Sequence, residues 1–268
     1  MTATSPTNET DAAAWAAQLA HDLEVCRRRQ REHDEFLALM AHDLRTPLTS
    51  IRGHAQLLRR APVNALGPAL PAGLGTIIEQ ADRLTALTDL LLDVGRIRTG
   101  QVVLRRTAAD LAHAVRRAVA ALAGQAGAAA IEVEAPGGGL VVDADATRLL
   151  QIARALLAFA MGRTAGAGRV RARIAQDGAA GCLAVDDEGP VLQADECAGL
   201  LDRLVTRAAD RATPMLGQVE LYIARGMVEA HGGRIVAESP APGSGVGARL
   251  SVWLPLLAGH AGGPKSDG

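Results

Sequence analysis

A histidine followed directly by an acidic residue stands in a stretch of sequence that favours a helix. These residues are His42 and Asp43, and Thr46 and Pro47 follow shortly after them. A neutral imidazole nitrogen is a nucleophile, and an adjacent carboxylate can orient the ring and take up its proton. Thr46 lies four residues after His42, so the two side chains share one helical face. These residue types at this spacing suit a nucleophilic histidine with a polar neighbour one turn away.

The element that must carry these residues is one long helix, predicted from residue 12 to Arg60. Apolar residues such as Phe36 and Met40 recur every three or four positions along it, which places an apolar stripe on one face. Pro47 interrupts this pattern. A proline inside a helix removes a hydrogen bond at a cost of roughly 3 kcal/mol, so its presence needs a specific reason.

A second helix is predicted from Thr76 to Arg98, after a turn at residues 61–75 that is rich in proline and glycine. It also carries an apolar stripe, which includes Leu84 and Leu91. Two antiparallel helices with long apolar stripes cannot cover themselves alone. We therefore expect the hairpin to pair with a second copy and form a dimeric four-helix bundle.

Beyond Gly100, short apolar segments alternate with helical ones, which predicts an α+β fold class. Strands are expected at residues 101–105, 131–135, 140–144, 169–176, 182–188, 232–239 and 248–255. Helices are expected at Asp110–Ala123, Ala146–Met161, Ala194–Val205 and Gly217–Ala230. The predicted organisation is a flexible N-terminus at 1–11, a helical hairpin domain at 12–100, an α/β sandwich at 101–257 and a flexible tail at 258–268.

Composition and charge exclude several classes of function. A hydrophobic content of 49% with a net charge of -1 is typical of a soluble globular protein and favours neither a nucleic-acid surface nor a membrane surface. The three cysteines, Cys26, Cys182 and Cys197, are too scattered for a disulfide framework or a metal site with close ligand spacing. The sequence shows no signal peptide and no long apolar span, so we expect a cytoplasmic protein whose input signal arrives through another protein or through cytoplasmic conditions.

The segment FLALMAHDLRTPLTSIRGHAQLL, residues 36–58, resembles the phosphoacceptor box of two-component sensor histidine kinases. The segment ADRLTALTDLLLDVGRIRTGQVVL, residues 81–104, resembles the return helix of the same dimerisation and phosphotransfer domain. The resemblance implies that His42 accepts a phosphoryl group, that Asp43 orients it and acts as acid or base, and that Thr46 positions the water that removes phosphate from a partner receiver domain. It also explains the proline, since a bend after the histidine belongs to the motif.

Residues 101–257 resemble the catalytic and ATP-binding domain of the same family, a Bergerat-type α/β sandwich. The segments that carry this resemblance are residues 143–160, 185–192, 221–239 and 243–255. The resemblance implies ATP and Mg²⁺ as cofactors, with Asp187 and Gly189 on the adenine side of the site.

The position that holds Mg²⁺ in this family is occupied by a residue that cannot bind it. The two asparagines of the family's N box are replaced by Ala155 and Phe159, and the second is the expected ligand. Mg²⁺ requires oxygen donors, and a phenyl ring offers none. We therefore assign no metal ligand. Gly162 and Arg163 stand where the family favours a lysine and an aromatic residue.

The glycine boxes and the aromatic box also depart from the family pattern. Val191 replaces the second glycine after Asp187, which predicts crowding of a backbone turn. The glycine-rich lid, expected at residues 216–221, retains one glycine out of register and carries Glu220 where backbone amides should face phosphate. Leu201 and Leu204 replace the two phenylalanines of the aromatic box.

Two functions remain open. The first is a histidine kinase that phosphorylates His42 from ATP and passes the phosphoryl group to an aspartate of a response regulator. The second is a pseudokinase, a phosphotransfer, phosphatase or docking module whose His42 receives phosphate from a receiver domain or from another histidine kinase. A purely structural coiled coil would not need the acid, threonine and proline after the histidine. The expected partners are a receiver domain and a second copy of the chain, with neither nucleic acid nor membrane.

Overall fold

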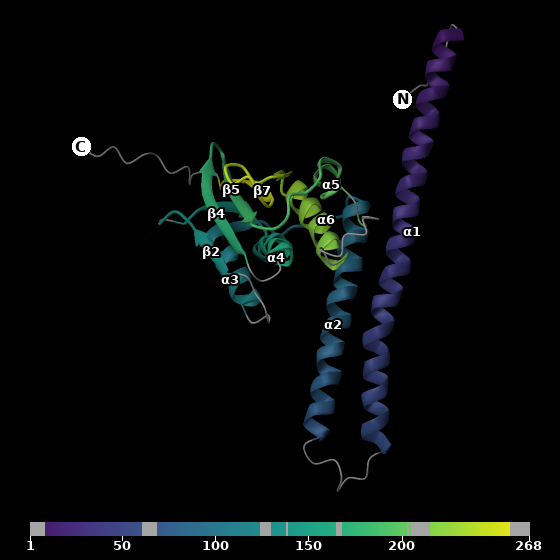
Figure 1. Cartoon of the computed structure of the whole chain (residues 1–268), viewed down its shortest axis with the longest axis vertical. Coiled ribbons are helices and arrows are strands. Elements are labelled where there is room, and N and C mark those ends of the chain that lie inside the picture. The colour runs from purple at the N-terminus through teal and green to yellow at the C-terminus, as the bar shows by residue number, and fades with distance from the viewer. Residues whose placement is uncertain are drawn as a thin grey trace, which may run out of the picture. The chain divides into compact units, whose positions relative to one another are not determined.

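Two long helices form the first part of the chain, and short strands and helices form the rest (Figure 1). The structure, a computed structural model, describes residues 9–60, 69–123, 130–137, 139–164, 168–202, 204 and 215–257. The chain divides into two compact units, Met1–Leu87 and Thr88–Gly268. Among the described residues, no helix combines the length and apolar character needed to cross a bilayer.

The first unit contains α1 (Glu9–Arg60) and most of α2 (Ala69–Arg98). The structure confirms the single long helix around His42, with Pro47 inside it. The second helix begins earlier than predicted because Pro71 lies in its first turn, where the missing N–H has no partner within a helix. Leu58 of α1 lies against α2, since a Cβ atom at Gly73 would be 3.2 Å from its side chain.

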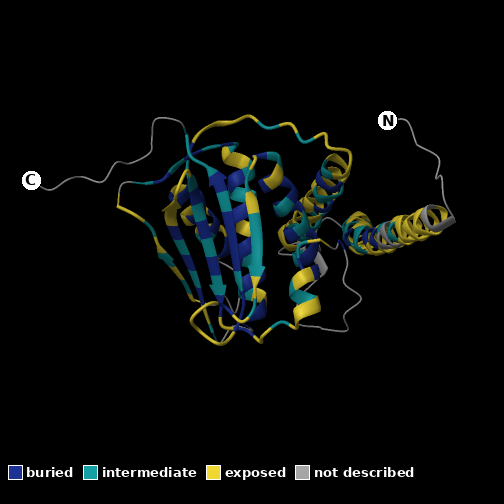
Figure 2. Ribbon diagram, turned by 90° about the horizontal axis from the view of Figure 1, so that it is seen from above, coloured by how far each residue is buried: buried dark blue, intermediate teal, exposed yellow. Residues whose placement is uncertain are grey.

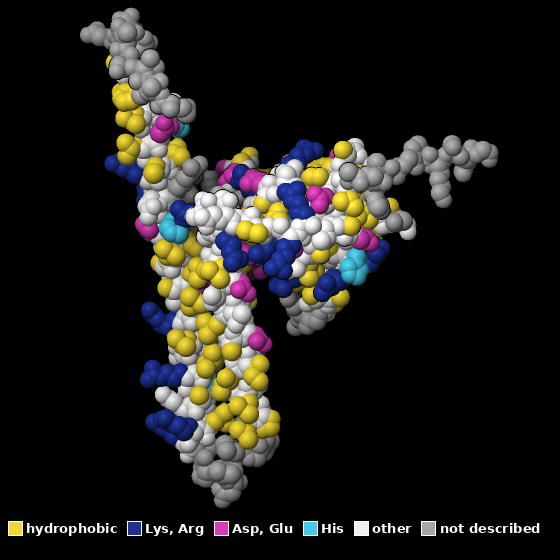
Figure 3. All heavy atoms as spheres, turned by 180° about the vertical axis from the view of Figure 1, so that it is seen from behind, with side chains coloured by type: hydrophobic (Ala, Val, Ile, Leu, Met, Phe, Trp, Pro, Cys, Tyr) yellow, Lys and Arg dark blue, Asp and Glu magenta, His cyan; other side chains and the backbone are white. Residues whose placement is uncertain are grey.

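The apolar residues of the hairpin are only partly buried. Phe36 and Met40 are each 1% exposed, and Leu87 is 2% exposed. Other large apolar side chains lie on the surface of both helices, and Figure 3 shows them gathered along the hairpin. They include Leu48, Leu57, Leu70, Leu74 and Ile78.

The second unit is built on a five-stranded sheet with the strand order β2-β4-β5-β7-β6, beside a two-stranded sheet of β1 and β3. The strands are β1 (Thr107–Asp110), β2 (Ala130–Glu134), β3 (Val141–Ala144), β4 (Arg169–Asp177), β5 (Ala180–Asp187), β6 (Arg234–Glu238) and β7 (Arg249–Pro255). The helices are α3 (Leu111–Leu122), α4 (Ala146–Arg163), α5 (Ala194–Gly199) and α6 (Met215–Ala230). β2 pairs with β4 in parallel, and every other strand pair described is antiparallel. This confirms the α+β class.

Some predicted boundaries were wrong. Residues 101–105 do not form a strand, and Val103 is 83% exposed; the strand that pairs with β3 begins at Thr107. The sequence at residues 101–105 has the apolar pattern of a strand, but this segment pairs with no other strand among the residues that the structure describes. Helix α5 ends at Gly199, and Val205 lies outside the described residues, as do residues 1–8 and 258–268 of the predicted flexible ends.

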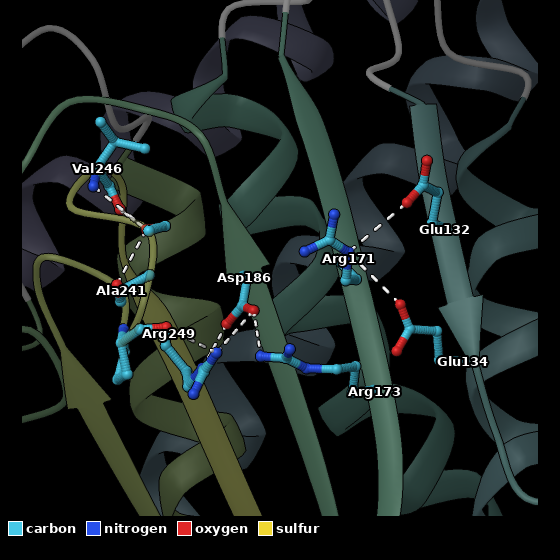
Figure 4. A network of polar contacts seen from close by, with 10 residues as sticks. Glu132, Glu134, Arg171, Arg173, Asp186, Ala241, Val246 and Arg249 are labelled. Atoms are coloured by element: carbon cyan, nitrogen blue, oxygen red, sulfur yellow. Dashed lines mark hydrogen bonds and ion pairs between the residues drawn. The ribbon is translucent and has the colours of Figure 1, made fainter.

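One face of the five-stranded sheet packs against α3, α4 and α6, and the buried residues lie between these layers (Figure 2). Side chains alternate between the two faces of a strand, so β5 points Leu183, Val185 and Asp187 toward the helices. Asp186 points the other way. On that outer face it accepts hydrogen bonds from Arg173 and Arg249, at 2.6 and 2.5 Å (Figure 4).

Further along the same outer face, the guanidinium of Arg171 lies between two carboxylates of β2. Its Nε atom is 3.6 Å from an oxygen of Glu132 and 3.6 Å from one of Glu134 (Figure 4). The outer face of the sheet is therefore covered by ion pairs, whereas the inner face is mainly apolar.

The last turns of α2 belong to the second unit and pack on its helices. Asp93 is 4% exposed and accepts hydrogen bonds from Arg148 Nη1 (2.8 Å) and Gln151 Nε2 (2.9 Å) of α4. Ile97 lies so close to α6 that a Cβ atom at Gly226 would be 2.6 Å from it. A buried carboxylate and a close apolar contact thus fix the end of α2.

Candidate functional site

The nucleophile predicted from the sequence lies on the surface of α1. The side chain of His42 is 77% exposed, and its Nδ1 atom is 3.4 Å from Oδ1 of Asp43. When Nδ1 carries the ring proton and faces this carboxylate, Nε2 has the free lone pair. The geometry therefore leaves the ring open to an electrophile and places a carboxylate beside its other nitrogen.

Thr46 and Pro47 lie one turn further along the same helix. The hydroxyl of Thr46 is exposed and lies 3.5 Å from the backbone carbonyl of His42. Pro47 is buried. The threonine hydroxyl thus lies on the surface that also presents the histidine, as the four-residue spacing predicts.

The predicted adenine site is centred on Asp187, the last residue of β5, whose side chain is 2% exposed. Its backbone N–H donates to the carbonyl of Ala248, and its Oδ1 accepts from the N–H of Gly189 at 2.8 Å. Gly247 has a φ of +66°, and a Cβ atom there would collide with the carbonyl of Asp187. Glycines thus allow two loops to close tightly around the carboxylate.

The second oxygen of the Asp187 carboxylate accepts a hydrogen bond from a side chain of the same domain. Nε of Arg163, at the end of α4, lies 3.0 Å from Oδ2 of Asp187, and the Arg163 side chain is 3% exposed. Nη2 of the same arginine donates to the carbonyl of Pro190. Burial raises the pKa of Asp187, while the charge of Arg163 and the hydrogen bond from Gly189 lower it. Removing one member of a buried ion pair typically costs about 3–5 kcal/mol.

The two N-box positions belong to the packed interior of α4. Ala155 and Phe159 are each 3% exposed, and the guanidinium carbon of Arg163 lies 5.5 Å from the centre of the Phe159 ring. A cation over an aromatic face at this distance is attracted to it. At the position expected to hold Mg²⁺, the side chain is therefore an apolar ring that packs against the guanidinium of Arg163.

The region expected to form the glycine-rich lid is helical where the structure describes it. Gly217 to Leu221 lie in α6, and Val219 and Leu221 are fully buried. Glu220 is partly buried, and desolvation raises its pKa although the charge of Arg154 opposes this. A carboxylate at this place disfavours an incoming phosphate when it is ionised.

Other predicted departures have milder consequences. Val191 does not crowd the turn after Asp187, because its side chain is 44% exposed and points into solvent. That prediction was wrong. Leu204 is 6% exposed and Leu201 is partly buried, so the residues that replace the aromatic box still pack as apolar residues.

The side chains at the two positions expected to contact Mg-ATP make other contacts within the domain. Asp187, the expected acceptor for the adenine amino group, already has both oxygens in hydrogen bonds. Phe159 offers no oxygen to a metal. Among the described residues, no cluster of three or more His, Cys, Asp or Glu side chains could hold a metal ion.

The fold and the two sites together define a class of protein: a helical hairpin that presents an exposed histidine, joined to an ATPase-type α/β sandwich. Family comparisons agree with both halves. Residues 32–100 match the His Kinase A (phospho-acceptor) domain, and residues 144–258 match the histidine kinase-, DNA gyrase B- and HSP90-like ATPase family. The chain belongs to the two-component sensor histidine kinase family.

Several curated relatives are similar over most of this chain. Histidine protein kinase DivJ of Caulobacter vibrioides is 31% identical over 83% of this chain and 37% of its own length. Sensor histidine kinase MtrB of Mycolicibacterium paratuberculosis is 31% identical over 84% of this chain and 40% of its own length. The chain therefore spans about two fifths of the length of these relatives.

Solved structures show the same fold. Full-length ShkA in complex with AMPPNP superposes with a TM-score of 0.60 at 22% identity, covering 84% of this chain and 46% of ShkA. Histidine kinase AdeS of Acinetobacter baumannii superposes with a TM-score of 0.56 at 18% identity, covering 80% of this chain and 98% of AdeS.

In the sequence, Arg163 is notable only because it stands where the family favours an aromatic residue. The sequence pattern did not predict that the side chain turns inward to Asp187. A signal was nevertheless present, since Phe159 and Arg163 are four residues apart and share the face of α4 that meets the end of β5.

Proposed function

We propose that this chain is a two-component signal transduction protein in which His42 carries a phosphoryl group and exchanges it with an aspartate of a response-regulator receiver domain. The observation that carries the proposal is the exposed imidazole of His42 beside the carboxylate of Asp43. In the transfer, Nε2 of His42 forms a bond to phosphorus as the donor's bond to phosphorus breaks. Asp43 orients the ring and stabilises the positive charge that develops on it.

Thr46 supports a second step at the same surface. Its hydroxyl is exposed one turn from His42 and is able to hold a water by a hydrogen bond. We expect this water to attack the phosphoryl group of a bound receiver domain. The direction of net phosphate flow then depends on whether His42 or Thr46 acts on the bound partner.

A direct test uses a phosphoryl donor that needs no nucleotide. Potassium phosphoramidate transfers phosphate to accessible imidazoles and releases ammonia. We expect the intact chain to gain one phosphate that is labile in acid and stable in base, and we expect His42→Ala to lose this gain. The matched control is His21→Ala, because His21 lies on the same helix and is exposed as His42 is. Equal labelling of His42→Ala and the unaltered chain would refute the proposal.

Transfer to a partner is a separate measurement. The chain phosphorylated on His42 is mixed with purified receiver domains, and loss of phosphate from the chain is compared with its appearance on the receiver. We expect Thr46→Ala to retain transfer to the receiver but to remove phosphate from it more slowly. A chain that neither binds nor exchanges phosphate with any receiver domain would contradict this part of the proposal.

The second candidate function is a module that acts on phosphate supplied by others. Both oxygens of Asp187 accept hydrogen bonds within the domain, and Phe159 stands where a metal ligand is expected. The test is incubation with ATP labelled on the γ-phosphate and Mg²⁺. Label on the unaltered chain that disappears in His42→Ala indicates a working kinase. No label, together with labelling by phosphoramidate, indicates a pseudokinase, and Phe159→Asn shows whether the metal position is responsible.

A further inference from the structure

The end of α4 and the end of β5 are joined by hydrogen bonds of the Arg163 side chain. Nε of Arg163 donates to Oδ2 of Asp187, and Nη2 of Arg163 donates to the carbonyl of Pro190. Oδ1 of Asp187 accepts from the N–H of Gly189. Each partner of the carboxylate comes from the same domain, so the site is satisfied without a ligand.

Packing contacts hold the arginine in addition to its hydrogen bonds. The guanidinium lies over the ring of Phe159, one turn earlier on α4. A Cβ atom at Gly189 would be 2.7 Å from the carbonyl of Arg163, so the loop after Asp187 touches the backbone of the arginine as well as its side chain. The space beside Asp187 is thus filled from α4.

A guanidinium and the amino edge of adenine present the same chemistry to a carboxylate, since both offer planar N–H donors. The arginine also carries a charge, which makes it the stronger partner for an ionised acid. We propose that Arg163 occupies the position where the base of a nucleotide would bind. Its guanidinium donates to the carboxylate of Asp187 and the carbonyl of Pro190, so the site no longer prefers adenine over other bases.

A nucleotide base can reach Asp187 only in molecules whose Arg163 has left this position. The apparent affinity for the base is reduced by the fraction of molecules in that open state. Both side chains of the pair are almost fully buried, at 3% and 2% exposure, so leaving requires an ion pair to separate inside the domain. In the folded domain, Asp187 therefore does not distinguish one nucleotide base from another.

The contact between Arg163 and Asp187 is independent of phosphate transfer to His42. Failure of the role proposed for Arg163 and failure of the proposed function are distinguishable, because one is measured by nucleotide binding and the other by labelling with phosphoramidate. Selective binding of adenine nucleotides would overturn the role of Arg163. Absence of phosphoramidate labelling on His42 would overturn the proposed function.

The experiment is calorimetric titration of the whole chain with the Mg²⁺ salts of ATP and ITP, which differ by the 6-amino group that Asp187 would accept. The unaltered chain is expected to show no preference between the two nucleotides. Arg163→Ala is expected to bind ATP at least about tenfold more tightly than the unaltered chain and to prefer ATP over ITP, since a good hydrogen bond to a charged acceptor is worth about that factor.

The matched control is Arg173→Ala, which removes an arginine from Asp186 on the outer face of the same strand. It should leave the binding of both nucleotides unchanged. A folded Arg163→Ala variant that gains no affinity for ATP would overturn the proposal, and so would an equal gain in Arg173→Ala.

Removal of Arg163 leaves Asp187 without its counter-charge, so the folded state of each variant is first verified by circular dichroism. Arg163→Gln replaces the alanine variant if that variant does not fold; its neutral amide holds Asp187 less strongly than a guanidinium, so it is expected to show a smaller gain of affinity for ATP. Titration of the unaltered chain with ATP and ITP is by itself a test of the role of Arg163. A preference for ATP over ITP of tenfold or more would mean that Asp187 is available to the base, and Arg163 would not be its occupant.

Discussion

Asp186 and Asp187 are neighbours on β5 with opposite surroundings. Asp186 faces outward between two partly exposed arginines, whereas Asp187 faces the helices and shares its buried position with Arg163. The alternation of side chains along a strand accounts for the difference. At the scale of single residues, the unusual chemistry of this domain therefore depends on which face of one strand each carboxylate occupies.

His231 shows the same dependence on surroundings. It is fully buried, its Nε2 accepts from the N–H of Asp145 at 3.0 Å, and its Nδ1 donates to the carbonyl of Met227 at 2.7 Å. Only the neutral ring can accept and donate in this way. Desolvation lowers the pKa of His231, and the charge of Arg106 adds to the effect, although Met227, Asp145 and Asp143 oppose it.

We predict that this histidine makes the fold sensitive to acid. Because its pKa in the folded state is below the unfolded value of about 6.5, the unfolded chain binds more protons in the window below that pH, and stability falls as the pH drops. Urea unfolding at pH 7 and pH 5.5 measures the loss. His231→Gln, which keeps one donor and one acceptor, should reduce it, whereas His113→Gln on the surface of α3 should not. An equal loss in all three chains would contradict the prediction.

At the scale of elements, the last turns of α2 and the helix α4 are joined inside the second unit. The last turns of α2 are fixed by Asp93, which is hydrogen-bonded by Arg148 and Gln151 of α4. The other end of α4 carries Phe159 and Arg163. One helix thus contacts α2 at its beginning and forms an ion pair with Asp187 at its end.

We predict that Asp93→Asn lowers the free energy of unfolding by about 2–4 kcal/mol, because it leaves the guanidinium of Arg148 without its buried counter-charge. The measurement is urea unfolding followed by circular dichroism. Asp89→Asn is the matched control, since Asp89 lies one turn earlier on the same helix and is exposed. If both variants lose the same stability, the contact between α2 and α4 contributes little.

At the scale of the whole molecule, the hairpin exposes more apolar surface than a single chain can cover. Leu70, Leu74 and Ile78 recur every four residues on α2 and are 38%, 46% and 62% exposed. Helical spacing places them in one row. We propose that a second copy of the chain covers this row, as expected for a four-helix bundle.

We predict that Leu74→Asp converts the dimer into a monomer. Burial of a leucine contributes about 1.5–3 kcal/mol, and two-fold symmetry places the substitution in the interface twice. Sedimentation equilibrium of the whole chain measures the change. Arg83→Asp, on the opposite side of the same helix, should leave the dimer intact. An unaltered chain that is monomeric at the highest accessible concentration would rule out the proposed bundle.

Local patterns in the sequence determined the phosphoacceptor box, the hairpin and the α+β class. These features depend on residues a few positions apart, such as His42 with Thr46 or the apolar stripe of α1, and helical geometry places such residues together without further information. The departures at Ala155 and Phe159 were likewise visible, because they stand at fixed places in a recognisable motif.

Only the tertiary structure decided what those departures produce. Arg163 and Asp187 are separated by a loop and a strand pair, and their ion pair depends on how the end of α4 packs against the end of β5. The strand at Thr107 rather than at residues 101–105 depends in the same way on the availability of β3 as a partner. Pairings between distant segments follow from packing, which periodicity in the sequence does not encode.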